Sequence, residues 1–375
     1  TEANTVTSQM LDEATPIVKK IRGIKAGVYV PTFEELMEHS YTLKAYFNKY
    51  PHIKEHVLNL KGQIRSVSRH AGGVLVADDL NKKINKQMPL INSGGVRQTP
   101  WSEGQNVRHL EPLGFIKFDI LGLASLRMVE GCIKHILRRH CGVETPSFSD
   151  VKEWYDKHLH PDVIDFNDQK VYKNIFHKGK WAGIFQFANS GAQNFCRKSK
   201  PKSIIDISAV TSIFRPGPLS AGVDNQYVNA KNNPSSVKYA HKLIKEVTKE
   251  THGFLIFQEQ IALLAHKLGK NLTLDEGNML RKLLTKKGTT GETYEKKKKI
   301  YNKFVEGCVE KGIDKSEAQK LWQTFEYFSG YGFNKSHAVS YSILSYQCAH
   351  LLNYYPSEWL AAFLDKEPED KKAKA

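Results

Sequence analysis

The sequence predicts an α+β protein in which a small β-rich part lies between two helical parts. Two observations support this fold class. Apolar residues recur at mixed three- and four-residue spacing over most of the 375 residues, which is typical of amphipathic helices. In the remaining stretch they form short runs rich in Val, Ile and Phe, bounded by Gly, Asn and Asp, which is typical of strands. The length allows two or three domains.

The elements are expected in this chain order: a helical part at residues 1–65, a β-rich part at 66–125, a mainly helical part at 126–362 and a basic, mobile tail at 363–375. The strand-like runs of the second part are "GGVLVADD", "MPLINSG" and "GFIKFDILGL". In the third part, Thr273 and Ser316 are expected to cap helices.

Composition narrows the class of protein. The 55 Lys and Arg residues exceed the 39 Asp and Glu residues by a formal net charge of +16, which is expected of a protein that binds phosphate backbones. No apolar stretch approaches the roughly 20 residues of a membrane span, and no signal peptide is evident, so we expect a cytoplasmic protein without a membrane partner. The five widely spaced cysteines are expected to be reduced.

The first candidate site is the stretch "GFIKFDILGL", in which Asp119 is the single carboxylate of an apolar run. A carboxylate at the end of a buried strand is a typical ligand of Mg²⁺. Lys117 lies two residues earlier and shares a strand face with Asp119, so it is expected either to contact a phosphate beside the metal or to pair with Asp119. The pairing is the alternative to a metal site.

A second candidate is the turn "SIFRPGPLSAG", whose one charge is Arg215. Two prolines and two glycines make this loop stiff, and a rigid guanidinium suits bidentate binding of a phosphate. The alternative is an exposed arginine on an ordinary turn.

A third candidate is "GYGFNKSHAVSYSILSYQ", where donors crowd at the expected start of a long helix. Helix N-termini favour anions, and aromatic faces suit a base or a sugar. The alternative is a structural glycine-rich turn. The expected nucleotide-binding residues in this stretch are Tyr331, Asn334, Lys335, Ser336 and His337.

Two further groups of residues are candidates for DNA or phosphate contacts. Arg281, Lys286 and Lys287 lie within two turns of one expected helix, where a solvated basic face is the alternative. Arg69 and His70 precede a glycine pair that would allow close backbone approach to a ligand or another strand.

Seven stretches, taken in order from about residue 35 to about residue 365, resemble the polymerase core of the family C DNA polymerases, the bacterial replicative DNA polymerase III alpha subunits. The first thirty residues match poorly. The stretches are "RHAGGVLVADDL", "GFIKFDILGL", "GIFQFANSGA", "SIFRPGPLSAG", "GFLIFQEQIALLA", "GNMLRKLLTKK" and the segment that begins at "FSGYGFNKSHAVSYSILSYQ".

The resemblance implies a helical thumb, part of a polymerase-beta-like nucleotidyltransferase palm and a large helical fingers domain. It implies that dNTPs are joined to a primer 3′ end on a DNA template, with two Mg²⁺ ions held by three aspartates. Asp119 matches the third aspartate and Lys117 the palm lysine. Arg215 and the stretch from Tyr331 to His337 match fingers residues at the incoming nucleotide.

The family's other two aspartates lie in a Pro-Asp-x-Asp-x-Asp motif, which this sequence lacks. The pair Asp78 and Asp79 is in the wrong place to replace it. We therefore expect a second chain that supplies the missing carboxylates, and sliding-clamp contacts through separate modules. Because the chain begins at Thr1 rather than Met, a split gene product, an intein-processed half or a trimmed form is expected. The alternatives in function are a non-catalytic DNA-binding subunit or structural fragment of a replisome, and an unrelated phosphate-handling enzyme.

Overall fold

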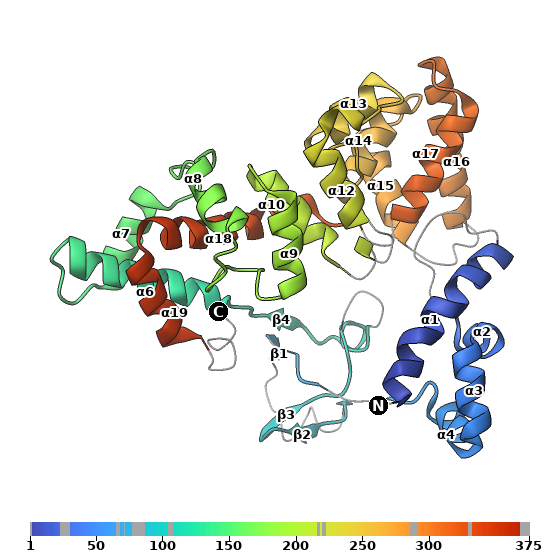
Figure 1. The fold of residues 1–375 in the computed structure, drawn as a ribbon, viewed down its shortest axis with the longest axis horizontal. Helices are drawn as coiled ribbons and strands as arrows, with labels where there is room; N and C mark the ends of the chain where they lie inside the picture. Colours follow the sequence, from blue (N-terminus) through green and yellow to red (C-terminus); the bar gives the residue numbers. More distant parts are fainter. Residues whose placement is uncertain are drawn as a thin grey trace. The chain divides into compact units, whose positions relative to one another are not determined.

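A computed structural model describes residues 2–22, 31–64, 68–70, 72–76, 87–103, 108–215, 218–219, 223–285, 292–328 and 332–367. The chain divides into two compact units, shown as a ribbon in Figure 1. The N-terminal unit comprises Thr1–Val18 and Pro31–Ala124, and the C-terminal unit comprises Lys19–Val30 and Ser125–Ala375.

The N-terminal unit begins with four helices, as expected for residues 1–65. These are α1 (Glu2–Ile21), α2 (Phe33–His39), α3 (Tyr41–Lys49) and α4 (Pro51–Leu60). Thr32 closes a capping box with Glu35 at the start of α2, and Pro51 occupies the first position of α4, where no backbone donor is needed. Val6, Leu36, Leu43 and Phe47 form the core of this bundle.

The β-rich part is smaller than the sequence predicted. Its described residues form two antiparallel two-stranded ribbons, in which β1 pairs with β4 and β2 pairs with β3. The strands are β1 (Gly73–Leu75), β2 (Ile91–Ser93), β3 (Val96–Gln98) and β4 (Lys117–Asp119), and the turn η2 (Glu111–Leu113) precedes β4. The molecule is thus mainly helical with small two-stranded sheets.

The C-terminal unit is helical, as expected. Its first helices are α6 (Ala124–His140), α7 (Phe148–His158), α8 (Gln169–Val171), η3 (Tyr172–His177), α9 (Ser190–Ser199), α10 (Ile204–Ile213) and α12 (Val223–Asn232). They are followed by η4 (Pro234–Ser236), α13 (Lys242–Thr248), η5 (Lys249–Thr251), α14 (Gln258–Leu268), α15 (Leu274–Thr285), α16 (Glu292–Glu310), α17 (Lys315–Phe328), α18 (Lys335–Tyr354) and α19 (Pro356–Lys366).

Two features organise this unit. Helix α18 is buried along much of its length and packs against α10, whereas α13 to α17 enclose a separate apolar core that includes Phe304, Trp322 and Phe325. The tail expected at 363–375 begins too early, because α19 continues to Lys366 and Phe363 is buried. Residues 368–375 lie outside the described residues. No helix in the described part of the chain is long and apolar enough to span a membrane.

Candidate functional site

The ribbon of β1 and β4 positions the first candidate residues. Gly73 lies opposite Asp119, and Leu75 lies opposite Lys117. Because side chains alternate along a strand, Lys117 and Asp119 share one face of the ribbon. Lys117 Nζ lies 3.0 Å from Asp119 Oδ1 and also donates a hydrogen bond of 3.2 Å to the carbonyl of Glu103. The expected alternative, a Lys117–Asp119 pair, is therefore present.

The expected burial of Asp119 is wrong in this structure. Its side chain is 51% exposed, whereas that of Lys117 is 19% exposed. The reason is that β4 pairs with β1 alone among the described strands, and its apolar neighbours Phe118 and Ile120 are also exposed. An exposed carboxylate keeps most of its hydration, so the ion pair with Lys117 is a weak one.

His70 lies beside this pair, with Nδ1 4.0 Å from Asp119 Oδ1. The same nitrogen accepts a hydrogen bond of 3.2 Å from the Gly72 backbone N–H. His70 therefore orients the glycine turn, and Lys117 is the nearer basic group to Asp119.

The glycine pair is required by close approach, as the sequence suggested. A Cβ on Gly72 would lie 2.3 Å from the carbonyl oxygen of Ile120, and a Cβ on Gly73 would lie 2.8 Å from His70 Nδ1. Gly72 thus approaches the backbone that follows β4, and Gly73 approaches the candidate side chain of His70. These glycines thus allow the geometry around Asp119.

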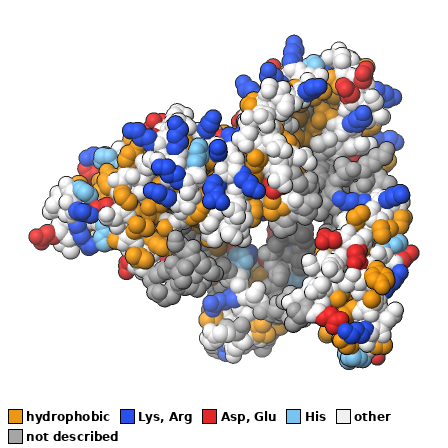
Figure 2. All heavy atoms as spheres, viewed as in Figure 1, with side chains coloured by type: hydrophobic (Ala, Val, Ile, Leu, Met, Phe, Trp, Pro, Cys, Tyr) orange, Lys and Arg blue, Asp and Glu red, His pale blue; other side chains and the backbone are white. Residues whose placement is uncertain are grey.

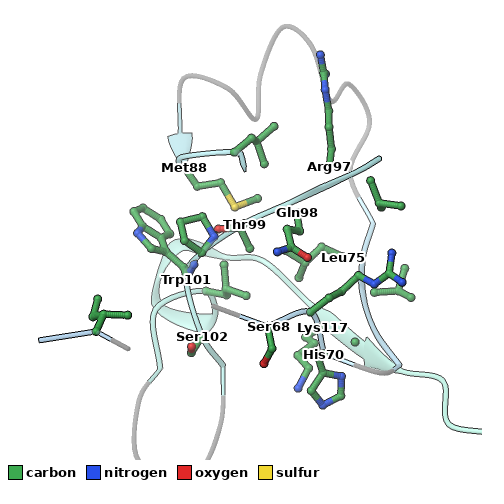
Figure 3. Close-up of a pocket in the computed structure, with 18 residues that line it drawn as sticks. Ser68, His70, Leu75, Met88, Arg97, Gln98, Thr99, Trp101, Ser102 and Lys117 are labelled. Atoms are coloured by element: carbon green, nitrogen blue, oxygen red, sulfur yellow. Dashed lines mark hydrogen bonds between the residues drawn. The ribbon is translucent and has the colours of Figure 1, made fainter. Parts of the chain in front are cut away.

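A cavity of about 700 Å³ lies on the Lys117 side of the ribbon (Figure 3). Arg69, His70, Arg97 and Lys117 contribute basic groups to its lining, and Met88 and Trp101 contribute apolar ones. The buried amide oxygen Oε1 of Gln98, another lining residue, has no hydrogen-bond partner among the described residues. Four basic side chains thus line one cavity, and two of them, His70 and Lys117, lie within 4.0 Å of Asp119.

The described residues do not by themselves form the expected site for two Mg²⁺ ions. They contain no group of three or more His, Cys, Asp or Glu side chains that could hold a metal. Asp119 offers one carboxylate, and Lys117 already neutralises part of its charge. Asp78 and Asp79 lie outside the described residues.

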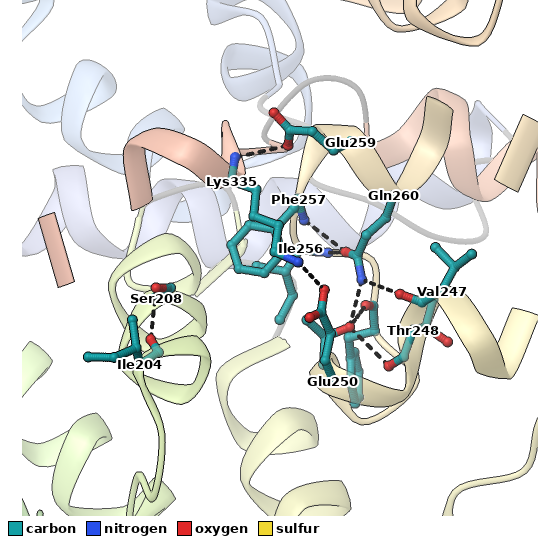
Figure 4. Close-up of polar contacts among 12 residues, drawn as sticks. Ile204, Ser208, Val247, Thr248, Glu250, Ile256, Phe257, Glu259, Gln260 and Lys335 are labelled. Carbon is teal, nitrogen blue, oxygen red and sulfur yellow. Dashed lines mark hydrogen bonds and ion pairs between the residues drawn. The ribbon is translucent and has the colours of Figure 1, made fainter. Parts of the chain in front are cut away.

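A second set of candidates gathers at the start of α18 in the C-terminal unit. Phe333 accepts a backbone hydrogen bond from Gln258 and donates one to Ile256, so this segment lies beside the start of α14. The Gln260 side chain accepts hydrogen bonds from the backbone N–H groups of Ile256 and Phe257 and donates one to Thr251 (Figure 4). This buried amide fixes the segment that positions α18.

The anion site expected at the start of α18 is occupied by the protein's own carboxylates. Glu259 accepts hydrogen bonds of 2.9 Å from the Lys335 backbone N–H and from Asn334 Nδ2. The ammonium of Lys335 lies 2.5 Å from Glu250 Oε1, as Figure 4 shows. Asn334 Oδ1 caps the helix by accepting from His337 N and Ser336 Oγ.

Arg281 of α15 belongs to the same cluster. Its Nη1 lies 3.6 Å from Glu259 Oε1 and 3.4 Å from Gln258 Oε1. The structure thus brings Arg281, Asn334 and Lys335 around a single carboxylate. Lys286, Lys287 and Tyr331 lie outside the described residues.

Arg215 lies beside a column of aromatic rings at the start of α18, formed by Phe333, His337 and Tyr341. Its guanidinium lies over the Phe333 ring, 4.5 Å from the centroid. The His337 ring is 5.3 Å from Phe333 and 4.1 Å from Tyr341 between centroids. Arg215 and His337 are exposed, so the column presents a cation and flat faces to solvent.

Glu250 and Glu259 were not predicted from the sequence as partners of the candidate residues. Glu259 lies in the quoted stretch "GFLIFQEQIALLA", but a glutamate in a first helical turn usually serves its own helix. The spacing of 76 residues between Glu259 and Lys335 carries no sequence signal for their contact.

Comparison with known proteins matches both units. The "Bacterial DNA polymerase III alpha NTPase domain" matches residues 3–122, and the "Bacterial DNA polymerase III alpha subunit finger domain" matches residues 146–312. The match begins well before residue 35, where the sequence resemblance was expected to start.

Three full-length relatives show the same similarity. The chain is 32% identical over 90% of its length to the DNA polymerase III subunit alpha of Campylobacter jejuni, 32% over 92% to that of Aquifex aeolicus, and 32% over 90% to that of Helicobacter pylori. It spans 26%, 26% and 25% of these relatives, about a quarter of each.

Proposed function

Because the chain belongs to the bacterial DNA polymerase III alpha subunit family, we propose that it forms part of a family C DNA polymerase, which adds dNTPs to a primer 3′ end on a DNA template. The observation that carries this proposal is the similarity along about 90% of the chain, which includes both a palm-type and a fingers-type unit. In this proposal α1–α4 form a thumb-like segment, the ribbons form the edge of a palm sheet, and the C-terminal unit forms the fingers. The site of action is the bacterial cytoplasm, or the host cytoplasm for a phage protein.

Asp119 has the role of one metal-binding carboxylate in this proposal. Its neighbour Lys117 contacts a phosphate of the primer or nucleotide. The Mg²⁺ ions require further carboxylates, because Asp119 alone cannot hold two ions. A segment outside these 375 residues supplies them, on a longer chain or on a second polypeptide, and sliding-clamp contacts also lie elsewhere.

The incoming nucleotide binds at the start of α18. Lys335 and Arg215 contact the triphosphate, and the exposed column of His337 and Phe333 faces the base or sugar, with Asn334, Ser336 and Tyr331 around it. Support comes from the cations and rings that gather there. A triphosphate that reaches Lys335 must displace Glu250, because an ammonium already paired with a carboxylate has lost much of its attraction for phosphate.

Primer-template DNA has its own candidate contacts. Arg69 and His70 line the cavity beside Asp119, and Arg281 stands in the cluster at α18. Lys286 and Lys287 follow Arg281 in the sequence. We assign these five residues to phosphate contacts with DNA.

Primer extension tests the polymerase proposal. The chain is co-expressed with a polypeptide that carries the family's other two aspartates, and the mixture is supplied with primer-template DNA, dNTPs and Mg²⁺. Extension is expected from the mixture and not from the chain alone. Asp119→Asn is expected to abolish extension while the two polypeptides remain associated, because the amide keeps the shape but loses the charge. Normal extension by the Asn variant would exclude a catalytic role for Asp119.

A non-catalytic DNA-binding subunit is the second candidate function. The observation that favours it is the absence of a three-carboxylate group among the described residues. DNA binding without extension in every mixture would support it.

A further inference from the structure

One surface of the C-terminal unit has an unusual charge. Between Asp168 and Asp206 the chain contains eight Lys and Arg residues and no Asp or Glu. All eight side chains are exposed. Figure 2 shows Lys and Arg side chains gathered over the region of α8 and α9. We call this surface the basic face, and its members are Lys170, Lys173, Lys178, Lys180, Arg197, Lys198, Lys200 and Lys202.

The fold brings the two ends of this stretch together. His177 Nε2 lies 2.7 Å from the carbonyl oxygen of Pro201, and Gln169 Nε2 donates a hydrogen bond of 3.0 Å to the carbonyl of Lys202. A Cβ built on Gly179 would lie 3.8 Å from Arg197 Cδ, so the turn after η3 contacts the end of α9. The segments that carry the eight cations are therefore adjacent in the fold.

Some lysines elsewhere in the same unit are paired with carboxylates, although not all of them are. The pairs include Lys134 with Glu130, Lys157 with Glu153, Lys267 with Glu246, Lys303 with Glu276 and Lys335 with Glu250. On the basic face no amino or guanidinium group lies within ion-pair distance of a carboxylate among the described residues; Arg197 donates to the Asn194 amide. Eight cations without internal partners repel one another, and a bound polyanion removes that cost.

Simpler roles explain only a part of the basic face. Arg197 and Lys198 lie in the last turn of α9, where cations stabilise the helix dipole. Lys170, Lys178 and Lys200 lie at the C-terminal ends of α8, η3 and α9, whereas Lys173, Lys180 and Lys202 lie in neither a last turn nor a C-cap. The nearest acids along the chain are already engaged, since Asp168 bonds to the Tyr354 hydroxyl and Asp206 pairs with Lys231.

The surroundings of the basic face favour nucleic acid over a lipid surface. None of the exposed large hydrophobic side chains lies between Asp168 and Asp206 among the described residues. Surfaces that bind membranes combine cations with apolar side chains that enter the bilayer. Cations without apolar neighbours suit a phosphate backbone, whose condensed counterions they release.

We propose that the basic face binds the phosphate backbone of nucleic acid, at a surface separate from the cluster at the start of α18. The proposed function enters only in the choice of DNA as the probe. Binding here needs neither dNTPs nor a catalytic carboxylate, so failure of the polymerase proposal would leave this inference intact.

The test measures DNA affinity of the full chain by fluorescence anisotropy, with labelled duplex and single-stranded probes over a series of salt concentrations. The variant Lys178→Gln/Lys180→Gln/Lys198→Gln/Lys200→Gln removes four charges from the basic face. The control Lys134→Gln/Lys152→Gln/Lys157→Gln/Lys267→Gln removes four charges that are paired within the same unit. Both variants have the same net charge, and thermal unfolding checks that both are folded.

The basic-face variant is expected to bind DNA at least tenfold more weakly at roughly 150 mM salt. Its salt dependence should become shallower by about 0.9 for each duplex phosphate that it no longer neutralises, or by about 0.7 for each single-strand phosphate. The control should stay close to the unaltered chain. Equal weakening in both variants, or none in either, would overturn the proposal. Binding to anionic vesicles without binding to either DNA probe would also overturn it.

Discussion

At the scale of single residues, Lys335 is a candidate contact for a triphosphate that already pairs with carboxylates of the protein itself. Its ammonium pairs with Glu250, and its backbone N–H donates to Glu259. Both side chains of the Lys335–Glu250 pair are about one-third exposed, so solvent screens their attraction. Such a pair holds the lysine in place without preventing a triphosphate, which carries more charge, from displacing the carboxylate.

Glu250→Gln should therefore tighten triphosphate binding. Removing the competing carboxylate frees the Lys335 ammonium, and a screened pair worth about 1 kcal/mol corresponds to about fivefold in affinity. Lys335→Ala should have the opposite effect. Calorimetric titration of the chain with dATP and with inorganic tripolyphosphate measures both. Glu246→Gln, which removes the partner of Lys267, serves as the control and should leave affinity unchanged. Weaker binding by Glu250→Gln would show that the pair supports the site rather than competing for it.

The residue scale also shows where sequence reasoning succeeded. Strand periodicity and the two-residue spacing predicted that Lys117 and Asp119 share a face, and they are paired. Burial of Asp119 was not predictable in the same way, because it depends on how many strands pair beside β4 and on what covers the ribbon. Those neighbours are tertiary contacts, which an apolar run of sequence does not specify.

At the scale of elements, helices were more predictable than strands. Helix α6 lies almost wholly within the part expected to be helical, and Thr273 caps α15 through a reciprocal bond with Glu276, as expected. Ser316 is not a cap, because α17 begins one residue earlier at Lys315. Of the strands, β3 was missed, since three residues after a Gly-Gly turn give little periodicity.

The β1–β4 ribbon depends on Gly72. The Gly72 carbonyl accepts a hydrogen bond of 2.7 Å from Ile120 N, and an added Cβ would lie 2.3 Å from the Ile120 carbonyl oxygen. Gly72→Ala should therefore separate β1 from β4 and lower the stability of the ribbon by about 1–3 kcal/mol. Hydrogen exchange of the peptide that contains β4 should speed up accordingly.

Gly122→Ala is the matched control for the ribbon. No atom of the described residues lies within 4 Å of a Cβ built there, so exchange in β4 should stay unchanged. Protection of β4 that is equal in the two variants would contradict the role given to Gly72. A faster exchange in Gly72→Ala alone would link the glycine pair to the placement of Lys117 and Asp119.

At the scale of the whole molecule, each unit has its own core, and the C-terminal unit also contains a buried ion pair. Asp206 of α10 lies 2.6 Å from Lys231 of α12, and both side chains are 8% exposed. His252, after η5, lies 3.7 Å from the same carboxylate and Lys202 N donates to it. Three segments that are far apart in the sequence thus meet at the Asp206 carboxylate, and no local sequence pattern predicts this contact.

This buried charge makes stability depend on pH. Burial would raise the pKa of the Asp206 carboxyl, but the nearby His252 ring and the Lys231 ammonium outweigh burial and lower the pKa to about 2, from 3.8. A carboxyl whose pKa is lowered by folding stabilises the folded state above its unfolded pKa. The ionised Asp206 carboxylate should therefore contribute about 2 kcal/mol to the free energy of unfolding above roughly pH 4, and this contribution should be lost as the pH falls through 2.

Urea unfolding of the chain between pH 2 and 7, followed by the fluorescence of its five tryptophans, four of which lie in the C-terminal unit, tests this dependence. The free energy of unfolding of Asp206→Asn should be about 3–5 kcal/mol lower at neutral pH, because Lys231 is left buried without a countercharge. Between pH 4 and 2 the stability of this variant should change less than that of the unaltered chain. Asp206→Asn/Lys231→Met should recover much of the loss, since it removes the orphaned ammonium as well. If the unaltered chain and Asp206→Asn lose stability in parallel over this range, the pH dependence belongs to other carboxylates, and the pair has only a packing role.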